Sequence, residues 1–326
     1  MKKIFSFLAI AAVLAISASC HKMAESSSAE TDSMSVHFRV GTEFTTKAAS
    51  NFGTGSQVDS LKVEVYRVVE AATGTTYVKT AAAPTITKVT NGEWDVDMKL
   101  AKSYKYRIAF WAHQSNNGIY NVKNLNNVVV KYSAIAINSD KADAFCAARE
   151  LNLNASITET VQLYRPLAQF NLGTNDLTEY LNSLVSSDVT SLNVGISVTQ
   201  VPSAINVLGG AADASGKVSA TTSTPLNVTF PAVPVLNVDD KIVVNTVSYE
   251  YLSMVYVLAS KGKELLDFTA TITNGTKTVN TVALNNVPYQ ANYRTNIVGQ
   301  LLTGNLHYDV VIVPGFYTPD YNEVVD

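Results

Sequence analysis

Residues 266–284 read LDFTATITNGTKTVNTVAL, and this stretch decides the fold class. Apolar and polar residues alternate from Leu266 to Ile272, and a second apolar series runs from Val279 to Leu284. Alternation with a period of two places the apolar side chains on one face of a β-strand. The Asn-Gly pair at 274–275 is the typical sequence of a two-residue hairpin turn of type I′. The stretch therefore predicts an antiparallel hairpin with one buried face.

The same alternation recurs along most of the chain. It is found in Met34 to Phe44, Leu61 to Val65, Trp94 to Leu100, Tyr104 to Phe110, Leu192 to Val198, Tyr293 to Leu301 and Leu306 to Ile312. A further strand is predicted from Val161 to Leu172, where Pro166 indicates an edge or a bulge. A dense apolar run from Tyr249 to Leu258 is expected in the core. Many short strands separated by turn residues are typical of β-sandwiches.

Two segments depart from the strand pattern and predict short helices. Thr174 to Ser186 has apolar residues at helical spacing behind Thr174 as the expected N-cap, and Ala142 to Leu151 is a second candidate. We place a domain boundary near the first of these. The sequence thus predicts an all-β protein with a few short helices, comprising one β-sandwich at residues 34–186 and another at 187–326.

Composition excludes several classes of protein. Hydrophobic residues make up 47% of the 326 residues, which excludes a disordered chain. Charged residues make up only 16%, and the formal net charge is −3. No run of Lys or Arg is present to neutralise phosphates, so we expect no nucleic-acid partner.

The N-terminus has the features of an export signal. Two lysines precede an apolar run from Ile4 to Ile16, which is too short to span a bilayer as a helix. Small residues and then Cys20 follow, and this order resembles a bacterial lipobox. We predict a lipoprotein signal peptide at residues 1–19, lipidation of Cys20 and a flexible Ser-rich tether at 20–33. An ordinary cleaved signal peptide is the alternative.

The chain has little recognisable chemistry. Its four histidines are not at metal-ligand spacings from one another, and we expect no catalytic residues, no metal and no cofactor. Asp140, Asp143 and the pair Asp239-Asp240 indicate solvated acidic turns rather than a calcium site. Cys146, the only cysteine besides Cys20, lies among apolar residues and is expected to be a buried thiol.

Several motifs, in order along the chain, together resemble a known family. They are YKYRIAFWA (104–112), ADAFCA (142–147), VQLYRPLAQFNLGTNDL (161–177) and VPYQANYRTNIVGQLLT (287–303), preceded by the lipobox and by TTKAA (45–49). They resemble the fimbrillin (FimA/Mfa-like) superfamily of Bacteroidales surface lipoproteins, in a fimbrillin-like branch of unassigned function. The resemblance implies two tandem transthyretin-like β-sandwich domains and a location at the outer membrane and cell surface.

The resemblance also implies a mechanism of assembly by β-strand exchange. A protease cuts after a basic residue behind the first strand, that strand leaves, and the C-terminal strand of another subunit fills the groove. The counterparts here are Lys47 as the candidate cleavage site, with Arg39 second. The departing apolar row would be Val36, Phe38 and Val40, and the donor row Leu306, Tyr308, Val310 and Ile312. The alternative for this last strand is that it closes the second β-sandwich. Burial of four donor side chains contributes roughly 6–12 kcal/mol before ordering costs.

The sequence therefore predicts a non-enzymatic, lipid-anchored surface protein that is a structural or adhesive component of fimbriae. Its expected partners are other fimbrial subunits or copies of itself, the outer membrane, and surface glycans or proteins. The main alternative is a glycan-binding surface lipoprotein that serves nutrient uptake. It would need exposed aromatic side chains, although Trp94 and Trp111 lie in alternating strands that favour core packing. A hydrolase would need two convergent carboxylates or an ordered metal.

Overall fold

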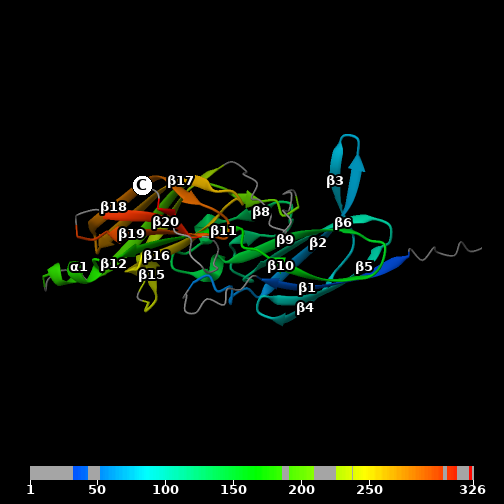
Figure 1. Ribbon diagram of the computed structural model, residues 1–326, viewed down its shortest axis with the longest axis horizontal. Coiled ribbons are helices and arrows are strands. Elements are labelled where there is room, and N and C mark those ends of the chain that lie inside the picture. Colours follow the sequence, from blue (N-terminus) through cyan, green and yellow to red (C-terminus); the bar gives the residue numbers. More distant parts are fainter. Residues whose placement is uncertain are drawn as a thin grey trace, which may run out of the picture.

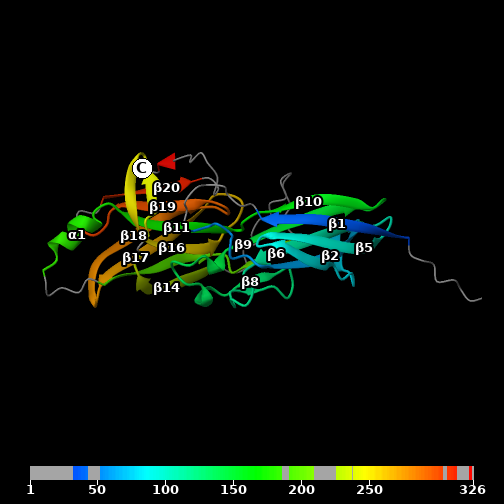
Figure 2. The same ribbon diagram turned by 90° about the horizontal axis from the view of Figure 1, so that it is seen from below.

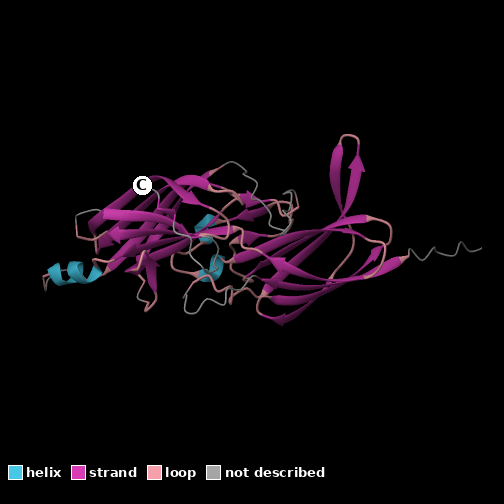
Figure 3. Cartoon of the chain, viewed as in Figure 1, coloured by secondary structure: helices cyan, strands magenta, loops and turns pink. Residues whose placement is uncertain are grey.

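The computed structural model describes residues 32–42, 52–185, 191–208, 225–236, 238–303, 307–313 and 323–324. This part of the chain consists mainly of β-strands and forms two lobes along one long axis, which confirms the predicted all-β class (Figures 1 and 3). The described helical elements are short. They are α1 (Leu177–Ser183) and two 3₁₀ turns, η1 (Tyr132–Ala134) and η2 (Asp140–Ala142).

The first lobe is a β-sandwich of two four-stranded sheets. One sheet has the order β10-β1-β5-β4 and the other the order β3-β2-β6-β9. Their bounds are β1 (Ser33–Thr42), β2 (Ser60–Ala71), β3 (Gly74–Lys79), β4 (Thr85–Thr90), β5 (Glu93–Ala101), β6 (Lys105–His113), β9 (Ala144–Asn152) and β10 (Ile157–Leu163). The alternating residues of β1 and β5 point inward, and their buried side chains form the core of this lobe with those of β2, β6 and β9. β3 extends away from the body as part of a hairpin with β2 (Figure 1).

The second lobe pairs a six-stranded sheet with a four-stranded sheet. Their orders are β15-β16-β11-β19-β20-β21 and β14-β12-β17-β18. The bounds are β11 (Leu167–Thr174), β12 (Leu192–Val201), β14 (Leu226–Pro234), β15 (Lys241–Val244), β16 (Val247–Leu258), β17 (Glu264–Asn274), β18 (Lys277–Tyr289), β19 (Arg294–Gln300), β20 (His307–Val313) and β21 (Glu323–Val324). β16 is fully buried from Leu252 to Leu258, as the apolar run predicted. α1 lies at the end of the molecule opposite the start of β1 (Figure 2).

β6 is buried on both faces and connects the two lobes. Ile108 and Phe110 point into the core of the first lobe, whereas Ala109 and Trp111 belong to a larger core that continues into the second. A small sheet of β13 (Ala204–Ile205), β8 (Val128–Val130) and β7 (Tyr120–Asn121) contributes to this larger core. The sequence pattern had indicated that β6 is half buried. Instead Arg107, on the face expected to be solvated, is only 7% exposed.

The helix predicted from Ala142 to Leu151 is wrong. This segment forms β9, which pairs with β6 in antiparallel register from Ala144 to Asn152. Its small side chains are buried on both faces, so it lacks the alternation that marks a half-buried strand. The helix predicted at Thr174–Ser186 exists as α1 but begins at Leu177, with Asp176 as its N-cap residue. Its apolar residues are not fully buried.

The hairpin predicted around Asn274-Gly275 is present, but its turn type differs. Asn274 pairs with Lys277, so the two turn residues are Gly275 and Thr276. Gly275 alone of these two has a positive φ, of 60°. Because a type I′ turn needs a positive φ at both central residues, the prediction of type I′ is wrong.

The strand predicted from Val161 to Leu172 is divided between the two lobes. The chain leaves β10 at Leu163 and enters β11 at Leu167, with Pro166 between them. β11 pairs with β16 and β19 of the second lobe. The division at residues 186 and 187 stays a prediction, and this pairing places β11 with the strands of the C-terminal half.

Candidate functional site

The inward-facing row of β1 fills the core of the first lobe. Val36, Phe38 and Val40 are 1%, 0% and 0% exposed. The Phe38 ring meets the Phe110 ring edge to face, with 5.5 Å between the ring centroids. The row is therefore buried, as the alternation predicted, and its departure stays a prediction. Its removal would leave a slot lined by the side chains of β2, β5 and β6.

β1 lies inside its sheet rather than at an edge. It pairs in antiparallel fashion with β5 from Ser33 to Gly41 and in parallel fashion with β10 from Val36 to Thr42. A slot vacated by β1 would thus have backbone donors and acceptors along both sides, which an incoming strand could pair with.

The outer face of β1 is polar and only weakly held. His37 Nδ1 lies 2.8 Å from Asp97 Oδ1, and Arg39 Nε lies 3.7 Å from Asp95 Oδ1. The Arg39 side chain is 71% exposed. Exposed pairs of this kind contribute at most about 1 kcal/mol each, so β1 is retained mainly by its inner face and its two ladders.

The two candidate cleavage sites differ in their surroundings. Arg39 lies in the middle of β1, where its backbone is opposite Thr160 on one side and Asp95 on the other. Lys47 lies between the end of β1 and Phe52 in the sequence, outside the described residues. Cys20 and the predicted signal peptide, which precede β1, also lie outside them. Proteases bind an extended backbone that is free to pair with them, so the ladders protect Arg39.

The predicted donor row lies on β20, in the second lobe. β20 pairs with β19 along its length and with β21 at Val311 and Ile312. Ile312 is 5% exposed and Tyr308 is 39% exposed, while Val310 is half buried. Leu306 lies outside the described residues. The donor row and the β1 row are in different lobes, so the structure does not bring them together within one chain (Figure 1).

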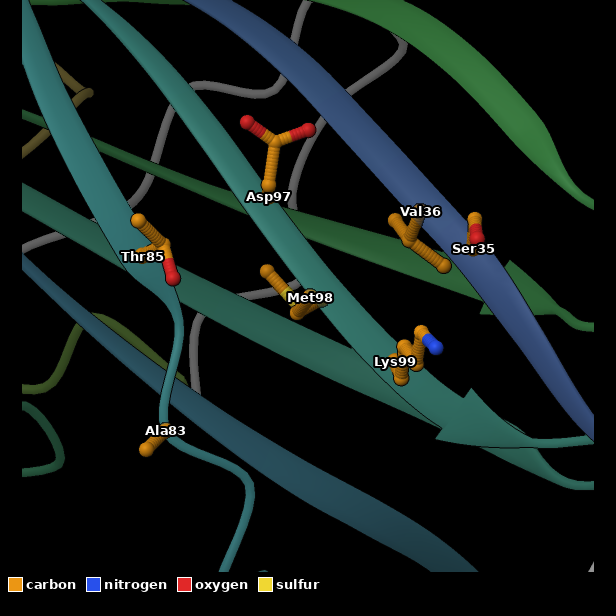
Figure 4. A pocket seen from close by; sticks show the side chains of 7 residues that line it. All are labelled: Ser35, Val36, Ala83, Thr85, Asp97, Met98 and Lys99. Carbon is orange, nitrogen blue, oxygen red and sulfur yellow. The ribbon is translucent and has the colours of Figure 1, made fainter.

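A shallow hollow of about 450 Å³ lies beside β1, where β4 begins (Figure 4). Its lining residues come from β1, β5 and the chain entering β4, and they are Ser35, Val36, Ala83, Thr85, Asp97, Met98 and Lys99. Polar and apolar side chains are mixed there, and Asp97 and Lys99 are the only charged ones. The lining therefore lacks the two convergent carboxylates that a hydrolase of sugars needs.

The residues considered for ligand binding lie in the interior. Trp94 and Trp111 are 1% and 0% exposed, as their alternating strands predicted, so neither can stack on a sugar in this state. Among the described residues, no group of three or more His, Cys, Asp or Glu side chains could hold a metal ion. Within the same residues, no helix is long and apolar enough to cross a membrane.

The acidic residues near 140 are buried, so the prediction of a solvated acidic turn there is wrong. Asp143 is 1% exposed and pairs with Arg165, whose Nε and Nη2 lie 2.5 and 2.8 Å from the two carboxylate oxygens. Asp140 is 8% exposed. Burial, and then the neighbouring Asp143 carboxylate, raise the pKa of Asp140 to about 6. The sequence feature that pointed to this buried ion pair was a lone arginine, Arg165, inside the apolar run VQLYRPLAQF (161–170).

Cys146 is buried as predicted. It is 2% exposed, and burial raises the pKa of its thiol to about 12. A thiol with such a pKa is not ionised at neutral pH, so it is a poor nucleophile.

Comparison with known proteins gives one family and several distant structures. A model described as "Family of unknown function (DUF6562)" matches residues 26–325. No protein with a curated description matches the chain.

The solved structures that match over most of their length include the following three. A candidate cell adhesion protein from Bacteroides ovatus is 9% identical, with 87% of this chain and 98% of that chain covered and a TM-score of 0.48. A fimbrial assembly protein from Parabacteroides distasonis is 11% identical, with 90% and 98% covered and a TM-score of 0.42. The fimbrial anchor protein Mfa2 from Porphyromonas gingivalis is 13% identical, with 85% and 97% covered and a TM-score of 0.36. These proteins are of the kind that the sequence resembles, but at such TM-scores the likeness carries no argument about activity.

Proposed function

Because this chain belongs to the DUF6562 family, whose function is unknown, we propose a function from its own geometry: a non-enzymatic cell-surface protein that assembles with fimbrial subunits by strand exchange. In this proposal β1 leaves the first lobe after proteolysis, and the C-terminal strand of another subunit takes its place. The product is a structural or adhesive component of fimbriae.

The observation that carries the proposal is the position of β1. Its row of Val36, Phe38 and Val40 is almost fully buried, and the strand lies between two hydrogen-bonding partners. Burial of three such side chains contributes roughly 4.5–9 kcal/mol before ordering costs. An emptied slot would expose this apolar surface and two unpaired strand edges. Refilling by a strand with alternating apolar residues is therefore strongly favoured.

The location of Lys47 gives the proteolysis a defined consequence. The residue lies after β1 in the chain, so a cut there separates β1 from the rest of the protein. If Cys20 carries the lipid, as we propose, β1 stays with the membrane anchor through the tether at residues 20–33. The body of the protein would then be released from the anchor as its slot opens. Uncut chains would remain lipid-anchored at the outer membrane.

The donor strand in the proposal is β20, with Leu306, Tyr308, Val310 and Ile312 as its row. The two rows belong to opposite lobes, so donation from one chain to the next joins the second lobe of one subunit to the first lobe of another. Head-to-tail contacts of this kind are heterologous and generate open filaments.

Limited proteolysis of protein lacking residues 1–20 tests the proposal. A trace of a trypsin-like protease is added, and unboiled samples are run on a denaturing gel. We expect a ladder of multimers and a new N-terminus at Ala48. The variant Lys47→Gln should remain monomeric. Lys123→Gln, which changes an exposed lysine between β7 and β8, is the matched control and should still form the ladder.

A second arm tests the donor strand. In Ile312→Asn the clipped chain should release β1 but form no ladder, because a buried donor side chain has become polar. Clipped wild-type monomers without multimers would exclude a stalk role and leave an anchor or tip subunit.

The glycan-binding alternative receives no support from the described aromatic residues that the sequence singled out. Trp94 and Trp111 pack in the interior and form no platform. Binding of the uncut protein to surface polysaccharides in a glycan-array measurement would revive it.

A further inference from the structure

The backbone of Phe52 and Gly53, which follow Lys47 in the sequence, is held by several hydrogen bonds. Gly53 N–H donates to both carboxylate oxygens of Asp140, at 3.1 and 3.0 Å. Gly53 C=O accepts from Arg165 Nη2 at 2.9 Å, and Phe52 C=O accepts from Arg294 Nη2 at 3.3 Å. Phe52 is 8% exposed and its ring lies 6.2 Å from that of Tyr251. Three backbone polar groups of this dipeptide thus have charged or buried partners.

The groups that hold Gly53 are themselves buried and mutually satisfied. Arg165 is 2% exposed, forms a bidentate pair with Asp143 and lies 4.7 Å from the centroid of the Phe145 ring. Tyr256 O–H donates to Asp140 at 2.9 Å. Hydrogen bonds to charged groups in such surroundings are among the strong ones, because few water molecules compete for them.

These groups come from elements that are far apart in the chain. Asp140 begins η2, Asp143 precedes β9, Arg165 precedes β11, and Tyr256 lies in β16. They meet where the two lobes join, so they move with the body of the protein and not with β1. Gly53 has a φ of 76°, a left-handed conformation that glycine adopts without strain. The sequence Phe-Gly is therefore suited to this position.

We propose that these four residues, named here the Gly53 clamp (Asp140, Asp143, Arg165 and Tyr256), set the C-terminal limit of the segment that can leave the first lobe. The inference rests on the proposed strand exchange and adds the residues that bound it. When the chain is cut after Lys47, the part before the cut departs with β1. The part after the cut is retained from Phe52 onward, because its backbone is fastened to the junction. Without the clamp, the chain after the cut would detach as far as β2, which begins at Ser60. That detachment would expose the core of the first lobe.

Hydrogen exchange of the uncut protein measures the clamp directly. The variant Asp140→Asn is nearly isosteric, but it places an amide NH₂ toward donors and removes the charge that Gly53 N–H binds. We expect the amides of residues 52–56 to exchange roughly tenfold faster than in the wild type. The matched control is Asp59→Asn, which alters another hydrogen-bonded carboxylate of the same segment, bound to Ser115 N–H at 2.6 Å. It should leave residues 52–56 unchanged.

Tyr256→Phe is a second and milder variant, for use if Asp140→Asn does not fold. It removes a single hydroxyl group from the clamp and should accelerate the same amides in the same direction. Unchanged exchange of residues 52–56 in these variants would overturn the proposal.

Trimming of the clipped protein from its new N-terminus then tests whether the clamp sets the C-terminal limit of the segment that can leave. After the cut at Lys47, an aminopeptidase is added and the new N-terminus is found by mass spectrometry. We expect trimming of the wild type to stop before Gly53 and that of Asp140→Asn to continue past it. Trimming past Gly53 in the wild type, with the ladder still formed, would refute the clamp and leave strand exchange intact. If residues 33–47 stay bound and no ladder forms, strand exchange itself fails.

Discussion

Replacement of Phe38 by alanine tests whether the inner row of β1 holds that strand in place. Phe38 is 0% exposed, and its ring packs edge to face on Phe110. The substitution removes the largest side chain of the row and leaves the two backbone ladders of β1 in place. Arg39→Ala is the matched control, because it alters the next residue on the outer face, whose side chain is 71% exposed.

The expected loss of stability follows from burial. A buried phenylalanine replaced by alanine costs about 3–5 kcal/mol, part of which is the lost contact between aromatic rings. We take about 4 kcal/mol for Phe38→Ala. With a urea slope of about 2 kcal/mol per molar, the unfolding midpoint should fall by about 2 M. The control should cost about 0.5 kcal/mol or less, since an exposed pair at 3.7 Å contributes little.

Tryptophan fluorescence during urea unfolding is the assay. The chain has two tryptophans, Trp94 on β5 and Trp111 on β6. Trp94 is buried in the core of the first lobe, whereas Trp111 belongs to the larger core that continues into the second lobe. The contribution of Trp94 therefore reports on the lobe that contains β1. A second readout is the multimer ladder after clipping at Lys47, which should form at lower protease doses in Phe38→Ala because β1 departs more easily.

A change below about 1 kcal/mol for Phe38→Ala would refute the reasoning. It would mean that the ladders with β5 and β10 hold β1 and that the apolar row is dispensable. Equal losses for Phe38→Ala and Arg39→Ala would refute it as well.

Three further predictions concern buried groups outside β1. Burial and then Asp143 raise the pKa of Asp140 to about 6, so the folded chain binds this proton more tightly than the unfolded one. The resulting stabilisation is complete below about pH 4 and is lost as the pH rises through 6. Measured by urea unfolding, the free energy of unfolding of the wild type should fall by about 3 kcal/mol relative to that of Asp140→Asn as the pH rises between those limits. A difference between the two proteins that does not change with pH would contradict this. Asp176 accepts hydrogen bonds from Thr174 and from Leu302 and Thr303 N–H at 3.0 and 2.9 Å, which hold its pKa below the usual range despite burial. Asp176→Ala should therefore destabilise the second lobe by roughly 3 kcal/mol in calorimetry, and a loss under about 1 kcal/mol would speak against a buried carboxylate there. Cys146 should react with a thiol reagent only when urea unfolds the chain, whereas rapid reaction of the native protein would show that the thiol is accessible.

Much of the strand content could be predicted because half-buried strands have a visible period of two. β1, β5 and β17 have an inward row and an outward row, and the structure buries the inward rows as expected. β9 could not be predicted in this way because both of its faces are covered and its residues from Ala144 to Ala148 are uniformly small or apolar. The periodic signal disappears when a strand is buried on both sides.

The candidate site was predictable in part. The buried row of β1 follows directly from alternation, and the structure places Val36, Phe38 and Val40 in the core. The clamp was not predictable, because it joins Gly53 with Asp140, Arg165 and Tyr256, which are up to about two hundred residues apart. A lone buried arginine signals that a partner must exist, since an unpaired buried charge is costly, but it does not say which carboxylate that partner is.

The sequence by itself determined the all-β class, the faces of most strands and the hairpin at Gly275, because these depend on neighbours within a few residues. Only the tertiary structure decided that β1 lies between β5 and β10, that β11 pairs with the second lobe, and that Asp143 meets Arg165. Those arrangements depend on pairing between distant segments. Alternation shows which face of a strand is apolar but carries no information about the strand that will lie beside it.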